Sequence, residues 1–161
     1  LFVEGSTSNA NVGNGLNVQA GGRAAGETAR LDALITNNQF EANAGLGAFL
    51  QTTDVPAGFA GGELIALLEG NSISNNGTGG GTTDFEARNS PNGEMCISMT
   101  TNAFALDANL RNLGGTATAE IDGFTNSPIT NIGFTTAPFG TVCLPSFTLQ
   151  EAAFAPLGLI R

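Results

Sequence analysis

Residues 68–76 read Leu-Glu-Gly-Asn-Ser-Ile-Ser-Asn-Asn, and this short pattern occurs four times in the chain. It returns at residues 35–43 as Ile-Thr-Asn-Asn-Gln-Phe-Glu-Ala-Asn, at 99–107 as Met-Thr-Thr-Asn-Ala-Phe-Ala-Leu-Asp, and at 3–6 as Val-Glu-Gly-Ser. The register positions Ser6, Asn38, Asn71 and Asn102 are separated by 32, 33 and 31 residues. Repeats of this length are typical of a solenoid, in which each repeat forms one coil.

Apolar residues alternate along each repeat. A period of two indicates a strand with one buried face, so equivalent apolar side chains are expected to stack from coil to coil. A second strand is predicted at residues 16–19 and again at 48–51, with a less regular copy at 83–86. Gly-rich connections are expected at residues 20–29, 52–62 and 87–93. The stacked sets are Leu31, Leu64 and Met95; Ala33, Ala66 and Ile97; Ile35, Leu68 and Met99; Phe40, Ile73 and Phe104; and, at a second bend, Asn43, Asn76 and Asp107.

The repeats at 35–43 and 68–77 resemble the right-handed parallel β-helix, particularly the Asn-rich repeats of secreted and cell-surface bacterial proteins. The resemblance covers roughly residues 1 to 110 and implies an all-β solenoid of about three to four coils with an atypical C-terminal cap. We expect residues 1–112 to form the coils and residues 113–161 to form the cap and an apolar tail. The fold carries lyases, hydrolases, adhesins and inert stalks alike, so it says little about activity.

The register asparagines Asn38, Asn71 and Asn102 are predicted to form a ladder at one corner. Each side chain would bond the backbone or amide of the next coil, as in other stacked β-structures. The alternative is that these asparagines bind a sugar or an ion.

The chain has two cysteines, Cys96 and Cys143, and no histidine. A disulfide is favoured over a metal site, and it would close a loop of roughly 48 residues, worth about 4 kcal/mol on the chain-entropy estimate. The expected location is therefore extracellular or on the cell surface.

The composition argues against several classes of function. A net charge of −9 disfavours nucleic acid and anionic membrane surfaces as partners. No apolar run approaches the ~20 residues of a spanning helix. Lys, His and Tyr are absent, so no obvious proton shuttle exists, and we expect neither catalysis nor a cofactor or metal. The column Arg30, Glu63 and Glu94 on successive coils predicts an ion pair on a solvated surface, with a metal site as the alternative.

The repeat is lost beyond Asn112, although residues 116–121 still alternate and predict one more strand. The C-terminal third is expected to cap the solenoid, pinned by Cys96–Cys143. A second reading is that the apolar tail pairs with the open first coil of a neighbouring molecule. The residues predicted to take part in this assembly are Leu1, Phe2, Val3, Phe147, Leu149, Phe154, Leu157 and Ile160.

The sequence thus predicts an extracellular structural protein that assembles with itself, end to end, into fibres or surface layers. The competing prediction is a cell-surface adhesin or glycan-binding module that uses the loops at 20–29, 52–62 and 87–93.

Overall fold

The computed structural model describes residues 1–21, 29–53, 62–77, 83–104, 107–113, 118–122 and 132–133. Within them the chain forms strands and no helix. None of the described residues therefore forms a helix long and apolar enough to cross a membrane.

The strands form three sheets, and all strand pairs are parallel. Sheet A contains, in spatial order, β1 (Phe2–Glu4), β4 (Arg30–Thr36), β7 (Glu63–Glu69), β10 (Glu94–Thr100) and β13 (Thr118–Asp122). Sheet B contains β2 (Thr7–Asn9), β5 (Gln39–Glu41), β8 (Ser72–Ser74) and β11 (Ala103–Phe104). Sheet C contains β3 (Leu16–Gly21), β6 (Ala48–Thr53), β9 (Thr83–Asn89), β12 (Asp107–Asn112) and β14 (Ile132–Gly133).

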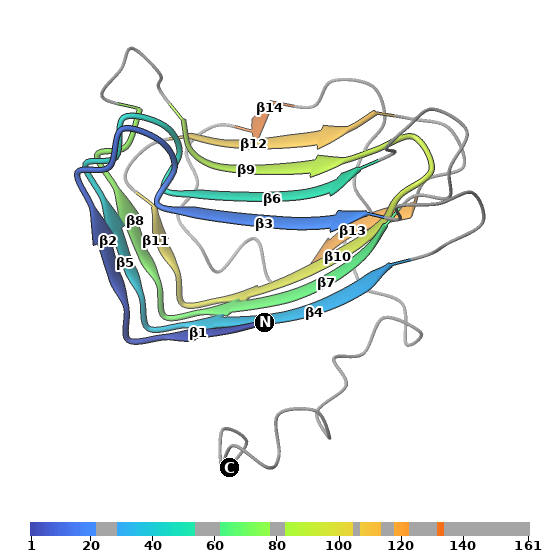
Figure 1. The fold of residues 1–161 in the computed structure, drawn as a ribbon, viewed down its shortest axis with the longest axis horizontal. Coiled ribbons are helices and arrows are strands. Elements are labelled where there is room, and N and C mark those ends of the chain that lie inside the picture. The colour runs from blue at the N-terminus through green and yellow to red at the C-terminus, as the bar shows by residue number, and fades with distance from the viewer. Residues whose placement is uncertain are drawn as a thin grey trace.

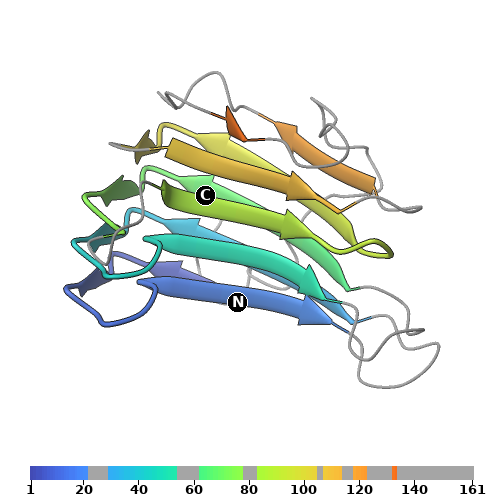
Figure 2. The same ribbon diagram turned by 90° about the horizontal axis from the view of Figure 1, so that it is seen from above.

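From β1 to β12 the chain visits the three sheets in turn, so each circuit adds one strand to each sheet beside the strand from the circuit before. Sheets A and C lie opposite each other and sheet B closes one side between them (Figure 1). The view from above shows the strands of successive circuits side by side in chain order (Figure 2). The predicted all-β parallel solenoid is therefore confirmed.

The strand register matches the register predicted from the repeat. Ile35 pairs with Leu68, which pairs with Met99, and all three side chains are fully buried. Val3 of β1 is the partner of Ile35, as expected from the equivalence of the two segments. A single coil has no second apolar layer to pack against, so this stacking is what removes each inward side chain from water. Burying each Leu or Ile contributes roughly 1.5–3 kcal/mol.

One continuous apolar cluster fills the space between the sheets. Sheet B contributes Phe40, Ile73 and Phe104, and the ring of Phe104 lies edge-on to Phe85 of β9 at 5.7 Å between centroids. Sheet C contributes Leu50 and Leu110 among others.

Both corners of the coil use the same backbone conformation. The residue before each ladder position has a positive φ, which turns the chain sharply between two strands. At the first corner this residue is Gly5, Asn37, Gly70 or Thr101, and at the second it is Ala10, Ala42 or Asn75. Asn and Gly tolerate this left-handed region well, whereas Ala and Thr adopt it at a cost.

One predicted connection is wrong. Residues 87–93 do not form a protruding loop, because β9 continues to Asn89 and the side chains of Ala87 and Asn89 are fully buried. The copy of the second strand predicted at 83–86 aligns poorly because the chain between β6 and β9 is longer than one repeat. Ala48 pairs with Phe85, so the separation of these two partners exceeds the repeat length. The strand predicted at 116–121 appears as β13. The number of coils and the C-terminal cap depend on residues outside the described ranges and remain predictions.

Candidate assembly edge and asparagine ladders

The first corner carries the predicted asparagine ladder. Asn38 donates from its backbone N and from Nδ2 to Oδ1 of Asn71, at 3.0 Å each. Asn71 repeats this with Oδ1 of Asn102, at 3.0 and 2.8 Å. At the start of the ladder, the backbone N of Ser6 donates to Oδ1 of Asn38 at 2.9 Å. The three asparagines are buried.

The ladder satisfies both amide hydrogens of Asn38 and of Asn71. Besides its bond to the next coil, Nδ2 of Asn38 donates to the carbonyl of Val3, and Nδ2 of Asn71 donates to that of Ile35. These carbonyls lie three residues before the register position of the preceding coil. A buried polar group without a partner costs about 1–3 kcal/mol. Because the network gives each of these buried groups a partner, its role is to stabilise the stacking of the coils. With these amide groups committed within the protein, the alternative of sugar or ion binding gains no support.

A second ladder runs along the other corner. Asn11 donates from N and Nδ2 to Oδ1 of Asn43, at 3.1 and 2.8 Å. Asn43 bonds Oδ1 of Asn76 in the same way, at 3.1 and 2.9 Å. The bend predicted at Asn43 and Asn76 is therefore present, and it is built like the first.

The second ladder ends on a carboxylate. Oδ1 of Asp84, a fully buried residue of β9, accepts from N and Nδ2 of Asn76 at 2.9 Å each. The repeat places Asp107 at the next position of this column, and the side chain of Asp107 lies outside the described part of the structure. The sequence reading missed Asp84 because it lies eight residues after Asn76 and outside the 32-residue register.

Two glycines allow sheet C to approach this ladder closely. A Cβ on Gly47 would lie 2.4 Å from Cγ2 of Ile73 and 2.5 Å from Nδ2 of Asn76. Gly15, one coil earlier, is crowded in the same way by Asn43.

Replacing Gly47 by alanine is expected to lower the free energy of unfolding by about 1–3 kcal/mol, because the added methyl group forces ladder and core side chains apart. Denaturant unfolding measures the change. Gly13→Ala is the matched control, since a Cβ there meets no atom within 4 Å. Equal stability of the two variants would contradict the close packing.

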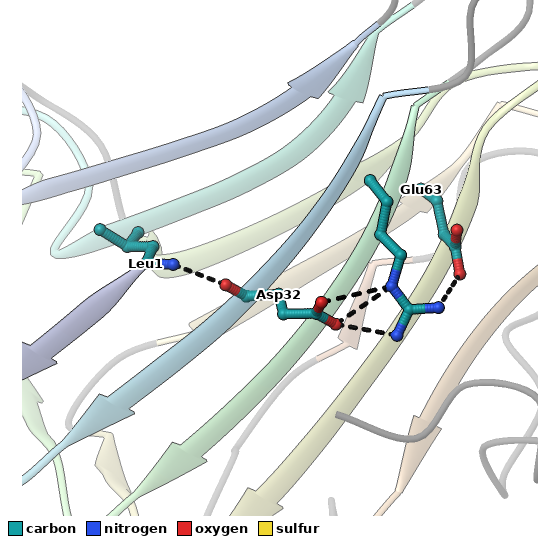
Figure 3. A network of polar contacts seen from close by, with 4 residues as sticks. Leu1, Asp32 and Glu63 are labelled. Atoms are coloured by element: carbon teal, nitrogen blue, oxygen red, sulfur yellow. Dashed lines mark hydrogen bonds and ion pairs between the residues drawn. The ribbon is translucent and has the colours of Figure 1, made fainter. Parts of the chain in front are cut away.

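The predicted ion pair at the start of sheet A is also present. Nη1 of Arg30 lies 2.9 Å from Oε1 of Glu63 on the neighbouring strand. Arg30 also binds Asp32 of its own strand, with Nη2 at 2.9 Å from Oδ1. Figure 3 shows this network continuing to the terminal amine of Leu1, which donates to the backbone carbonyl of Asp32 at 2.7 Å.

Asp32 was not predicted as a partner of Arg30, although two residues apart on one strand share a face. The hydrogen bond with Asp32 is the main cause that raises the pKa of Arg30, and the charges of Asp32 and Glu63 raise it further against an opposing effect of burial. The guanidinium therefore stays charged at every working pH. Glu94 lies beside Glu63 in the register, as predicted. The partly exposed ion pair of Arg30 with Glu63 contributes under about 1 kcal/mol.

No group of three or more acidic, Cys or His side chains among the described residues is placed to hold a metal ion. There is also no free cysteine among them. Cys96 lies in β10, and Cys143 lies outside the described residues, so the predicted bridge remains a prediction. The same holds for Phe147, Leu149, Phe154, Leu157 and Ile160 of the tail, and for most of the loops at 20–29 and 52–62.

In the described part of the chain, β1, β2 and β3 of the first coil each have one hydrogen-bonded neighbour and form an edge of their sheet. The predicted assembly residues Leu1, Phe2 and Val3 lie on this edge. In a parallel sheet, alternate residues direct both backbone groups to the same side. Gln39 donates to the carbonyl of Ser6, so Thr7 directs its N–H away from β5. Likewise Leu16 donates to the carbonyl of Gly47, so Asn17 directs its N–H away from β6.

Comparison with known proteins found no matching family model, curated protein or solved structure.

Proposed function

We propose that the protein is a structural subunit that stacks end to end with copies of itself, as an extracellular fibre or surface assembly. The first coil of one copy receives the C-terminal end of the next. The observation that carries the proposal is the N-terminal edge of the solenoid, where three parallel strands lie in the same coil with backbone groups directed outward.

The geometry of the edge favours another parallel coil as its occupant. An unpaired strand edge is a template for pairing, and here three such edges are spaced as one coil of this same solenoid requires. A second copy supplies the coil shape without any new fold. Association through a non-closing, head-to-tail contact produces a fibre.

The second ladder supports the same arrangement. Within the solenoid, the carboxamide oxygens of Asn43 and Asn76 accept hydrogen bonds from the coil before them. Asn11 is exposed and uses Nδ2 for Asn43 and for Oγ of Ser8. Its carboxamide oxygen occupies the position at which the oxygens of the later ladder asparagines accept hydrogen bonds from the coil before them. An incoming coil can therefore extend the ladder as well as the sheets.

The edge can be tested without changing the hydrogen bonds inside the subunit. Thr7→Pro combined with Asn17→Pro removes two outward N–H donors, each worth about 1 kcal/mol, and is expected to weaken association roughly thirtyfold. Sedimentation velocity over a range of concentrations measures the association, and negative-stain microscopy shows whether rods lengthen along the solenoid axis.

The matched control is Thr7→Ala with Asn17→Ala, which keeps both N–H groups and should assemble like the parent protein. Thermal unfolding of both variants shows that the subunit remains folded. If the prolines prevent folding, Thr7→Lys with Asn17→Lys blocks the same edge by charge. Monodisperse short rods of the parent protein at the highest concentration would contradict the proposal, as would equal assembly of the blocked and control variants.

A further inference from the structure

The outer faces of sheets A and C differ in character. Apart from Phe49, the outward side chains of β3, β6 and β9 are polar or charged, and most of them are partly or fully exposed. Nε2 of Gln51 donates to Oε1 of Gln19 at 3.0 Å, and Arg88 binds Glu86 at 2.6 Å while lying over the ring of Phe49. This face is that of a sheet exposed to water on one side.

Sheet A carries an apolar patch on the centre of its outer face. In β7, Leu64, Ala66 and Leu68 belong to the interior cluster, so Ile65 and Leu67 between them project outward. By the same alternation Cys96 projects outward from β10 between Met95 and Ile97. The register places Ile65 beside Cys96, and Phe2, Leu34 and Leu67 side by side in the adjacent column. We call Phe2, Leu34, Ile65, Leu67 and Cys96 the outer patch.

Three of the five residues of the outer patch are buried although they lie outside the interior cluster, and Phe2 and Leu67 are half-buried. Ile65 and Cys96 are each 2% exposed and Leu34 is 8% exposed. Strand β7 reads Leu-Ile-Ala-Leu-Leu between two glutamates. Such a continuous apolar run is typical of a parallel strand buried on both faces. Charged residues border the patch: Asp32 is the strand partner of Ile65, Arg30, Glu63 and Glu94 lie on one side, and Glu4 and Glu69 lie on the other.

We infer that the C-terminal segment of the same chain, residues 139–161, docks on the outer patch and is held there by a disulfide between Cys96 and Cys143. Cys96 is one of the chain's two cysteines and lies within the patch. A bridge to it brings residue 143 onto this face. The residues after Cys143 include Phe147, Leu149 and Phe154 and a single carboxylate, Glu151. Their apolar character matches the patch.

The length of this segment suits the patch. The 18 residues after Cys143 can extend at most about 60 Å, at ~3.3 Å per residue. Five strands spaced ~4.8 Å apart make sheet A about 20 Å wide across its strands. The segment can therefore cross every strand from an anchor at Cys96.

This inference does not rest on the proposed function. It places the tail on the flank of the solenoid, which differs from the sequence prediction that the tail itself pairs with a neighbouring copy. The edge strands of the last coil, rather than the tail, would then meet the first coil of the next subunit.

Limited proteolysis with chymotrypsin, which cuts after phenylalanine, tests the docking at a concentration where the protein is monomeric. Phe147 and Phe154 should be cut slowly in the oxidised parent protein. Ile65→Glu introduces a charge in the patch and should accelerate both cuts about tenfold or more, as should reduction of the disulfide. Gln51→Glu, on the outer face of sheet C, is the matched control and should leave the rates unchanged.

Each other outcome would overturn the inference. Cutting of the oxidised parent protein at the rate of an unfolded peptide would show that the segment is not docked. Equal rates in Ile65→Glu and Gln51→Glu would place it elsewhere. A disulfide-linked dimer on a non-reducing gel would assign the patch to the tail of a second copy. If Ile65→Glu does not fold, the half-buried Leu67→Ser and the reduced parent protein provide the same comparison, with circular dichroism as the check on folding.

Discussion

Asn71→Ala is expected to lower the free energy of unfolding by about 4 kcal/mol. The substitution removes the oxygen that accepts from both N and Nδ2 of Asn38, and it leaves the carbonyl of Ile35 without its donor. These groups are buried, and each one left without a partner costs about 1–3 kcal/mol. Denaturant unfolding followed by circular dichroism measures the change.

The control for this variant is Asn17→Ala, which removes an exposed carboxamide from β3 and should change stability by no more than about 0.5 kcal/mol. Asn71→Asp distinguishes the contribution of the accepting oxygen from that of the donating amide group. It keeps acceptors for Asn38 but cannot donate to Ile35 or Asn102. Its stability should fall below that of the parent protein. A loss of less than 1 kcal/mol in Asn71→Ala would mean that the ladder is dispensable.

The second large effect is expected at the carboxylate that ends the other ladder. Asp84→Ala should cost about 3 kcal/mol, since N and Nδ2 of Asn76 lose the acceptor that they share. The loss is large because Asp84 is fully buried, so that solvent cannot replace the bond without opening the coil.

Asp84→Asn is the informative companion, because it can keep an oxygen at the same position while it removes the charge and replaces the second oxygen with an amide nitrogen. It should retain most of the stability that Asp84→Ala loses, and unfolding measured under identical conditions gives the comparison. If both variants are equally destabilised, the contribution of Asp84 comes from its charge or its second oxygen and not from the bonds that it accepts at the end of the ladder.

Much of the architecture follows from the repeat alone. The nearly constant intervals between Ser6, Asn38, Asn71 and Asn102 indicate equivalent positions on successive coils. The alternation around Ile35 and Leu68 indicates strands with one face inward. The ladder follows from these two facts, because a carboxamide at a corner of stacked coils has a partner directly above and below it. The pairing of Arg30 with Glu63 follows from the same register.

What the repeat could not predict depends on departures from it. The residues between Asn76 and β9 lengthen the third coil, and this shift brings Asp84 to the ladder. The positive φ of Ala10, Ala42 and Thr101 at the corners could not be predicted either, since neither Ala nor Thr favours this conformation. The sequence does indicate the outer patch, although the alternation of apolar residues draws attention to the inner face only. Leu34 and Ile65 are apolar at outward positions, where a half-exposed strand has polar residues.

Both ladders run in one direction along the solenoid. In every step, the backbone N–H and the side-chain amide of one asparagine point to the oxygen of the later coil. A filament built from such subunits has two chemically unlike tips, one presenting acceptors and the other donors. In the filament that we propose, growth is expected at different rates at the two tips, and a filament anchored by one tip would elongate from the other.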